Sequence, residues 1–121
     1  MGRTYQMKVL VCGGRAYADH AAIFDALDTV DRRRPIKAII EGGESGADAI
    51  ARDWAESRRV RLRSFSGVEA DDEESRWSKR NQQMLDEGRP DLIIAFPGAR
   101  RTADMIDRAR AAGVTVLEVG G

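Results

Sequence analysis

Short apolar segments that resemble buried strands alternate along the chain with longer segments that carry apolar residues at helical spacing. The five strand-like segments are residues 7–12, 36–41, 60–65, 91–96 and 114–118. Near-continuous apolar segments of this length are typical of buried parallel strands. Strands and helices that alternate across short connections require right-handed crossovers and a parallel sheet. The sequence therefore predicts an α/β fold: a three-layer, Rossmann-like domain with a mostly parallel sheet of about five strands and helices on both faces.

Helix boundaries follow from capping residues and glycines. Asp19 is a good N-cap for the first helix, and Ser45 or Asp48 can cap the second. The acidic residues 69–74 open the third helix, as expected for side chains near a positive helix N-terminus, and the fourth helix covers residues 100–112.

Length and composition indicate one globular domain over residues 1–121, with residues 1–6 as an N-terminal extension. The apolar segment after this extension is too short for a signal peptide, and no apolar run approaches a membrane helix. We therefore expect a cytoplasmic protein without a membrane partner. Twenty basic and twenty acidic residues cancel, which disfavours nucleic acid as a partner. The single cysteine, Cys12, excludes an internal disulfide and disfavours structural zinc.

Glycine ends three of the predicted strands, at Gly13-Gly14, Gly42-Gly43 and Pro97-Gly98. Ligands of such sheets bind outside the carboxyl ends of the strands, and glycine lets backbone N–H groups approach a phosphate closely. For any one of these pairs, ordinary turn chemistry is the preferred explanation. Three at the same edge of the sheet favour a binding site.

The third glycine segment runs into a helix that starts with Arg100, Arg101 and Thr102. A helix N-terminus has free N–H donors and a partial positive charge, so arginines are unfavourable there unless an anion is bound. The segment is therefore predicted to hold a phosphate. The dinucleotide fingerprint GxGxxG and the Walker A lysine motif are both absent, which disfavours classical NAD binding and P-loop ATP hydrolysis.

Several other residues allow two interpretations. Asp48 could bind a ribose hydroxyl or stabilise the first turn of its helix, and Glu44 could be an acid near the ligand or an exposed side chain. Trp54 and Trp77 are expected to be core or subunit contacts. The acidic residues 69–74 are explained by the helix start, so no metal site is predicted, and no cofactor is expected.

Four groups of residues, in this order, also carry a resemblance to a known family. They are Val9 to Arg15, Gly42-Gly43-Glu44-Ser45-Gly46-Ala47-Asp48, Arg80-Asn81-Gln82-Gln83-Met84, and Pro97-Gly98 with Thr102-Ala103-Asp104. The set resembles the SLOG superfamily, and within it the YspA-like branch common in bacteria and phages. The superfamily also includes the Lonely Guy phosphoribohydrolases and the DprA-type DNA-processing proteins. The resemblance spans roughly residues 7–118.

The resemblance implies a Rossmann-like domain that binds a nucleotide or a nucleotide-derived ligand. In the Lonely Guy enzymes, a PGGxGTxxE motif binds phosphate and supplies a catalytic glutamate, and an arginine four residues before a methionine assists. Arg80 matches that arginine, whereas Met105 takes the place of the glutamate and Asp104 precedes it. Pro97, Gly98 and Thr102 match the phosphate motif.

We expect the protein to bind a nucleotide-derived small molecule as a sensor or binding module. The alternative is a phosphoribohydrolase that cleaves the N-glycosidic bond of a nucleoside 5′-monophosphate, with Arg80 and Asp104 as catalytic residues, so enzymatic activity is left open. The resemblance also implies self-association, with a homodimer favoured. The expected ligand-binding and phosphate-binding residues are Gly13, Gly14, Arg15, Gly42, Gly43, Ser45, Gly46, Asp48, Asn81, Pro97, Gly98, Arg100, Arg101 and Thr102.

Overall fold

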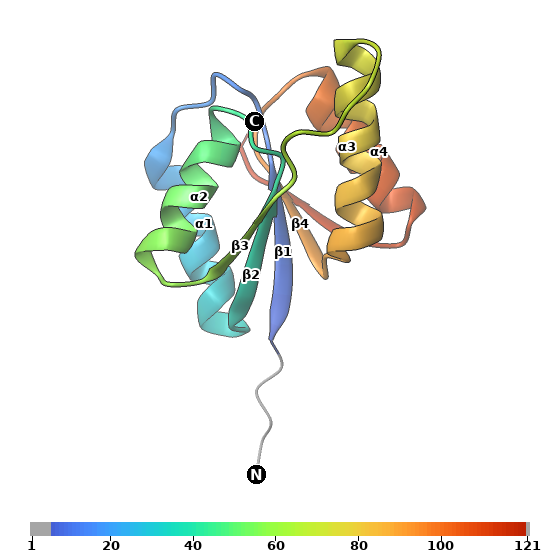
Figure 1. The fold of residues 1–121 in the computed structure, drawn as a ribbon. Helices are drawn as coiled ribbons and strands as arrows, with labels where there is room; N and C mark the ends of the chain where they lie inside the picture. The colour runs from blue at the N-terminus through green and yellow to red at the C-terminus, as the bar shows by residue number, and fades with distance from the viewer. Residues whose placement is uncertain (1–5, 121) are drawn as a thin grey trace.

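The computed structural model describes residues 6–120 and shows a five-stranded parallel sheet between two pairs of helices (Figure 1). The predicted three-layer α/β fold is confirmed. Most of the predicted N-terminal extension lies outside the described residues. In chain order the elements are β1 (Met7–Cys12), α1 (His20–Arg33), β2 (Ile36–Glu41), α2 (Ala47–Ser57), β3 (Arg61–Ser64), α3 (Glu73–Gly88), β4 (Leu92–Ala95), α4 (Arg100–Ala111) and β5 (Thr115–Glu118).

The central strand is β1, which pairs in parallel with β2 on one side and β4 on the other. The strand order is β3-β2-β1-β4-β5, so the chain first builds outward from β1 in one direction and then in the other. A topological switch point therefore lies between β1 and β4. The register sets Cys12 beside Ala95, which brings the carboxyl ends of these two strands together.

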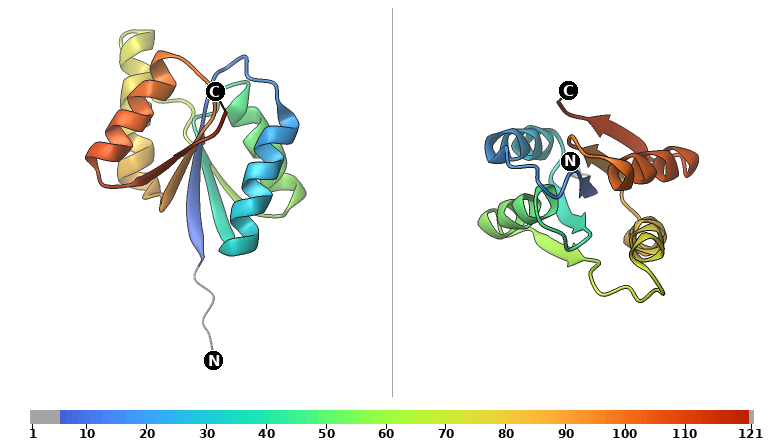
Figure 2. Two further views of the ribbon diagram at one scale, coloured as in Figure 1. Left: turned by 180° about the vertical axis from the view of Figure 1, so that it is seen from behind. Right: turned by 90° about the horizontal axis from the view of Figure 1, so that it is seen from above.

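The two faces of the sheet have separate apolar cores because side chains alternate along each strand. Val9 and Val11 of β1 pack with residues of α1 and α2, whereas Leu10 and Cys12 pack with residues of α3 and α4. The view from above in Figure 2 shows the two helix pairs on opposite sides of the sheet. Trp54 of α2 is fully buried in the first core, as expected for a core residue.

Helix capping agrees with the sequence for α1 and differs for α2. The Asp19 carboxylate accepts a hydrogen bond from the Ala22 N–H (3.0 Å). The N-cap of α2 is Gly46, with a φ of +71° and no side-chain cap. The prediction that Ser45 or Asp48 caps α2 is wrong, because the Ser45 hydroxyl donates to the Arg15 carbonyl (2.9 Å) and Asp48 binds the preceding loop.

The third helix begins later than the acidic segment that was expected to open it. Asp72 is its N-cap and accepts a hydrogen bond from the Ser75 N–H (2.7 Å). Residues 69–72 thus lie in the loop before α3. Glu73 and Glu74 lie in its first turn, where their negative charges interact favourably with the positive end of the helix dipole.

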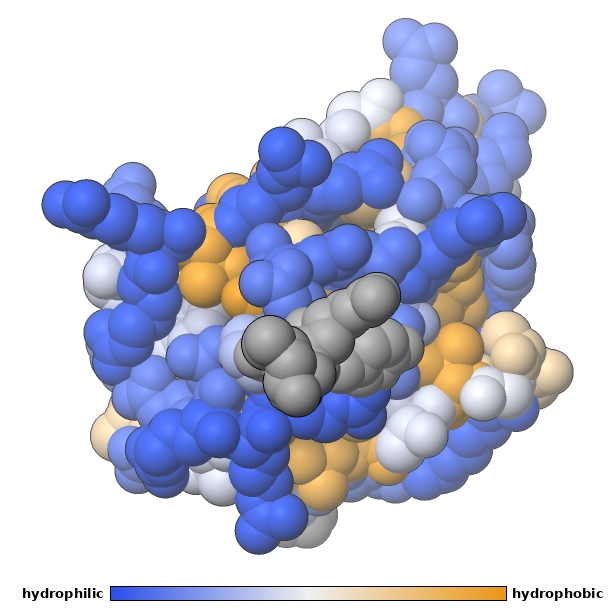
Figure 3. Space-filling view, turned by 90° about the horizontal axis from the view of Figure 1, so that it is seen from below, coloured by the Kyte–Doolittle hydropathy of each residue, from blue (hydrophilic) through white to orange (hydrophobic). Residues whose placement is uncertain are grey.

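The two ends of the sheet differ in character. Figure 3 shows the molecule from below, at the amino ends of the strands, where hydrophilic side chains cover most of the coloured surface. The carboxyl ends of the strands carry the glycine-rich loops. In residues 6–120, none of the helices combines the length and apolar character needed to cross a bilayer.

Substitution of Gly46 tests how tightly the loops pack at the carboxyl end of the sheet. A Cβ at Gly46 would lie 2.2 Å from the Gly14 carbonyl oxygen, whereas one at Gly113, also at positive φ (+77°), would meet no atom within 4 Å. We expect Gly46→Ala to lower the free energy of unfolding by about 2 to 5 kcal/mol, and Gly113→Ala by about 1 kcal/mol. Urea denaturation measures both values, and equal losses would contradict the close approach.

Candidate functional site

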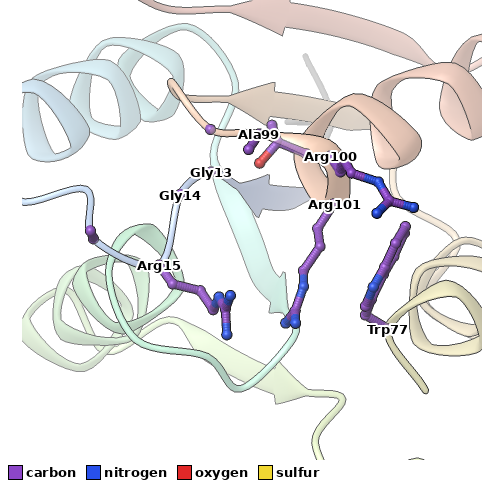
Figure 4. Close-up of a pocket in the computed structure, with 10 residues that line it drawn as sticks. Gly13, Gly14, Arg15, Trp77, Ala99, Arg100 and Arg101 are labelled. Carbon is purple, nitrogen blue, oxygen red and sulfur yellow. The ribbon is translucent and has the colours of Figure 1, made fainter. Parts of the chain in front are cut away.

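A hollow of about 540 Å³ lies at the carboxyl ends of the strands, at the switch point between β1 and β4 (Figure 4). The loop after β1 forms one wall, the start of α4 forms another, and Trp77 of α3 closes a third side. We call this hollow the anion pocket. Its lining residues are Gly13, Gly14, Arg15, Ala16, Trp77, Gly98, Ala99, Arg100, Arg101 and Thr102.

The walls of the anion pocket are held together by the backbone N–H and carbonyl groups of Gly14. Its N–H donates to the Pro97 carbonyl (2.9 Å), and its carbonyl accepts from the Ala47 N–H at the start of α2 (3.1 Å). Gly98 faces the same loop, since a Cβ there would lie 2.9 Å from the Gly14 nitrogen. Only glycine allows this approach, so these residues shape the pocket whether or not they touch a ligand.

The N-terminus of α4 faces the anion pocket without a cap. Its N-cap is Ala99, which has no side chain able to accept a hydrogen bond from the first turn. Arg100, Arg101 and Thr102 occupy that turn, where backbone N–H groups have no acceptor within the helix. The first turn contains no acidic residue to offset its partial positive charge. An anion would satisfy both the donors and the charge.

Arg101 is the most enclosed of the three pocket arginines, with a side chain that is 22% exposed. Its Nη1 donates to Glu44 Oε2 (3.1 Å), and its Nη2 donates to Glu73 Oε1 (2.5 Å). Arg15 Nη1 lies 3.7 Å from the same Glu73 oxygen, and Arg100 is paired with Glu74. The pocket cations are thus partly neutralised by carboxylates of the chain itself.

Glu44 links the anion pocket to Arg80. The Arg80 Nη1 donates to Glu44 Oε2 (2.8 Å), so one carboxylate oxygen receives both Arg80 and Arg101. Partial burial acts to raise the pKa of Glu44, but the Arg80 hydrogen bond and the charges of Arg80, Arg101 and Arg15 together lower it below its ordinary value. Glu44 is therefore an ionised, arginine-bound carboxylate at neutral pH.

Trp77 was expected in the core or at a subunit contact, but the structure places it in the wall of the anion pocket. It is half-buried, and its ring centroid lies 6.0 Å from the Arg101 guanidinium carbon (Figure 4). Trp77, Arg80, Asn81 and Met84 follow the spacing of one helix face. That spacing was a signal in the sequence from which the position of Trp77 could have been inferred.

A smaller cavity of about 30 Å³ lies next to the anion pocket and shares Gly13, Arg15, Arg101 and Thr102 with it. Burial, with contributions from Asp48 and Glu118, raises the pKa of the Cys12 thiol to about 12, so this thiol stays protonated and unreactive. Within residues 6–120, no three histidine, cysteine or acidic side chains are grouped to hold a metal ion. The other residues that line this smaller cavity are Val11, Cys12, Glu44, Asp48, Arg80, Asn81 and Met84.

Gly42, Gly43, Ser45 and Gly46 line neither cavity, although they were expected among the ligand-binding residues. The N–H groups of residues 42–44 already have acceptors within the chain. The Asp48 carboxylate accepts from Gly42 (3.1 Å) and Glu44 (3.3 Å), and Glu41 accepts from Gly43 (2.5 Å). The structure thus pairs the start of α4 with the Gly13-Gly14 loop in place of Gly42-Gly43. Of residues 42–46, only Glu44 reaches the cavities.

Asp104 and Asn81 connect α3 to α4. The Asn81 amide donates to the Arg101 carbonyl (3.1 Å) and to Asp104 Oδ2 (3.0 Å), and Arg108 Nε donates to the same oxygen (2.6 Å). Asp104 is absent from the lining of the anion pocket. Met105, at the position that matches the catalytic glutamate of the Lonely Guy enzymes, is fully buried in the core. This geometry gives Asp104 a positioning role between helices and offers no support for a catalytic one.

The two remaining residues of the expected phosphate motif are separated. Thr102 is buried and lines both cavities. Pro97 lies in neither lining and borders a different hollow, between α4 and the end of β5. Its carbonyl nonetheless accepts the hydrogen bond from Gly14 that holds the pocket walls.

The buried Asp48 predicts a specific pH dependence of stability. Burial and the charge of Glu41 raise its pKa from 3.8 to about 6. Between about pH 4 and 6 the folded state keeps a proton that the unfolded state has lost, so the contribution of Asp48 to stability falls as the pH rises. Asp48→Asn removes this titration and keeps an oxygen acceptor. The variant's stability relative to wild type should therefore rise by about 2 kcal/mol from pH 4 to pH 7.

Urea denaturation of both proteins across that pH range measures this difference. A difference in unfolding free energy that does not change with pH would contradict the raised pKa.

In sequence, the Gene 61 protein of Mycobacterium phage D29 is 31% identical over 124 residues, which cover 93% of this chain and 96% of the phage protein. Residues 7–68 match the family model described as the YspA, cpYpsA-related SLOG family.

In structure, the chain resembles the DNA processing protein A (DprA) of Streptococcus pneumoniae, with a TM-score of 0.75 and 16% identity over 95% of this chain and 50% of that one. It resembles a putative UDP-N-acetylglucosamine 2-epimerase of Listeria monocytogenes more weakly, with a TM-score of 0.56 and 12% identity over 94% of this chain and 30% of that one. The chain thus spans half or less of these proteins, and the likeness shows the fold alone. The match over residues 7–68 and the phage relative show that this chain belongs to the YspA, cpYpsA-related SLOG family.

Proposed function

We propose that the protein binds a phosphate-containing, nucleotide-derived small molecule in the anion pocket and acts as a sensor or binding module. The observation that carries this proposal is the uncapped N-terminus of α4, flanked by Arg15, Arg100 and Arg101 at the switch point of the sheet. Free N–H donors, a positive helix end and planar guanidinium groups together suit a phosphate.

The size and lining of the anion pocket support a ligand larger than phosphate alone. Its volume of about 540 Å³ lies within the usual range for small-molecule sites. The half-buried Trp77 in the pocket wall offers an aromatic surface on which a base can stack. The phosphate would bind at Arg101 and the start of α4, with the base toward Trp77.

The carboxylates near the anion pocket favour binding without turnover. Cleavage of an N-glycosidic bond requires a carboxylate that is free to stabilise an oxocarbenium-like state or to activate water. Glu44 is bound by Arg80 and Arg101, while Asp104 is bound by Asn81 and Arg108. Neither side chain is free for this chemistry in the geometry of the site.

The expected homodimer stays a prediction from the family resemblance. Among residues 6–120, the large hydrophobic side chains that are exposed are Leu62 and Leu117. They lie on the edge strands β3 and β5, whereas the resemblance implies contacts through helix faces.

Ligand binding is tested by the thermal stability of the protein with AMP, ADP, ADP-ribose and 3′,5′-cyclic AMP at millimolar concentration. We expect at least one of these compounds to raise the melting temperature, because a ligand that binds only the folded state stabilises it. Arg101→Ala should weaken that binding by about tenfold or more, since it removes a charge-assisted contact. Arg61→Ala, on the distant strand β3, is the matched control. No shift with any compound would overturn the proposal.

The absence of turnover is tested separately by incubating the purified protein with AMP. We expect AMP to stay intact, because Glu44 is bound by arginines and Met105 stands where the Lonely Guy enzymes have their catalytic glutamate. Chromatography detects free adenine and ribose 5-phosphate. Their release by wild type, reduced in Glu44→Gln, would identify the protein as a phosphoribohydrolase instead.

A further inference from the structure

The first turn of α3 lies beside the anion pocket and contacts its arginines through two carboxylates. Glu73 Oε1 is 2.5 Å from Arg101 Nη2 and 3.7 Å from Arg15 Nη1. Arg101 belongs to α4 and Arg15 to the loop after β1, so this one oxygen faces guanidinium groups from two walls of the pocket. Glu74, the next residue, is paired with Arg100. Figure 4 shows the side chains of Arg15 and Arg101 extending into the pocket.

We propose that Glu73 is an internal competitor for the ligand's phosphate, and that the arriving anion displaces it and loosens the first turn of α3. This inference rests on the proposed function of the pocket. Its basis is that the carboxylate of Glu73 already makes, with Arg101 and Arg15, the contacts expected of a bound anion. Glu73 is also free to leave, because its side chain is 66% exposed.

The displacement selects the class of ligand. A monoanionic carboxylate that replaces Glu73 gains nothing in charge, since it exchanges one carboxylate contact for another. A terminal phosphate carries about −1.5 to −2 charges and three acceptor oxygens. It can bind both guanidinium groups and still accept from the free N–H groups of Arg101 and Thr102. The pocket is therefore selective for phosphate esters and diphosphates over carboxylates.

The same contact gives the protein a way to report that the anion pocket is occupied. Glu73 and Glu74 follow the N-cap Asp72, and the loop before them contains residues 66–72. Displacement of Glu73 breaks one of the two ion pairs that join this first turn to α4 and leaves the pair of Glu74 with Arg100. Trp77 lies one helical turn after Glu73, so its fluorescence responds to the change. Trp54, the other tryptophan, is fully buried and donates its indole N–H to Asp28, so it supplies a constant background.

The test compares Glu73→Gln with Glu69→Gln. Both variants remove one negative charge from the same end of the molecule, but Glu69 makes no hydrogen bond or ion pair with residues 6–120, so only Glu73→Gln loses the contacts with Arg101 and Arg15. Affinity for inorganic pyrophosphate and for ADP is measured by tryptophan fluorescence at low salt, with acetate as the monoanionic probe.

We expect Glu73→Gln to bind pyrophosphate and ADP about 2- to 5-fold more tightly than wild type, as loss of an exposed ion pair allows. Glu69→Gln should match wild type, and acetate should compete poorly in all three proteins. The fluorescence of ligand-free Glu73→Gln should also shift toward that of ligand-saturated wild type. Thermal unfolding of each variant verifies that it is folded.

The other outcomes are distinct. If wild type binds and Glu73→Gln binds equally or more weakly, the competitor role is overturned and the proposed function stands. If both variants gain affinity equally, the gain comes from the loss of a negative charge acting at long range. The competitor role is then also overturned. If neither wild type nor any variant binds pyrophosphate or ADP, the phosphate-binding function of the pocket fails together with this inference.

Discussion

Two of the three backbone hydrogen bonds that Gly14 makes within residues 6–120 hold together the end of the sheet at which the site forms. One joins the loop after β1 to Pro97 before α4, and the other joins it to the first residue of α2. Both require backbone segments to approach more closely than side chains permit, which explains glycine at positions 14, 46 and 98. The N-terminus of α4 is thereby placed beside the first loop, and a helix start becomes one wall of a pocket.

The electrostatics of the pocket depend on this placement. Arg15, Arg100 and Arg101 would be an unfavourable cluster beside a positive helix end, and the chain offsets them with Glu44, Glu73 and Glu74. Glu44 is bound at a fixed position by Arg80 and is only 29% exposed, whereas Glu73 and Glu74 are exposed and lie on another element. The Glu44 carboxylate is thus a permanent part of the site, whereas the carboxylates of Glu73 and Glu74 can be displaced by a ligand.

Part of the site could be predicted from the sequence because it depends on local chemistry. An arginine-rich helix start after Pro97-Gly98 is visible in sequence, and so is a glycine loop after β1. The role of Gly42–Gly46 could not be predicted from spacing, because it depends on where the Asp48 carboxylate points once α2 has packed. The position of Trp77 could have been inferred from its spacing to Arg80 on one helix face. The partners of Asp104 could not, because the packing of α3 against α4 determines which side chains meet between these helices.

The sequence by itself determined the alternation of strands and helices, the parallel sheet and the family, because these follow from hydrophobic periodicity and short motifs. Only the tertiary structure decided which loops meet. The order β3-β2-β1-β4-β5 sets β1 beside β4, so the first glycine loop faces α4 and the second turns its N–H groups inward to Asp48 and Glu41. Long-range pairing of strands and the burial of individual carboxylates are collective results of packing, and residue spacing does not encode them.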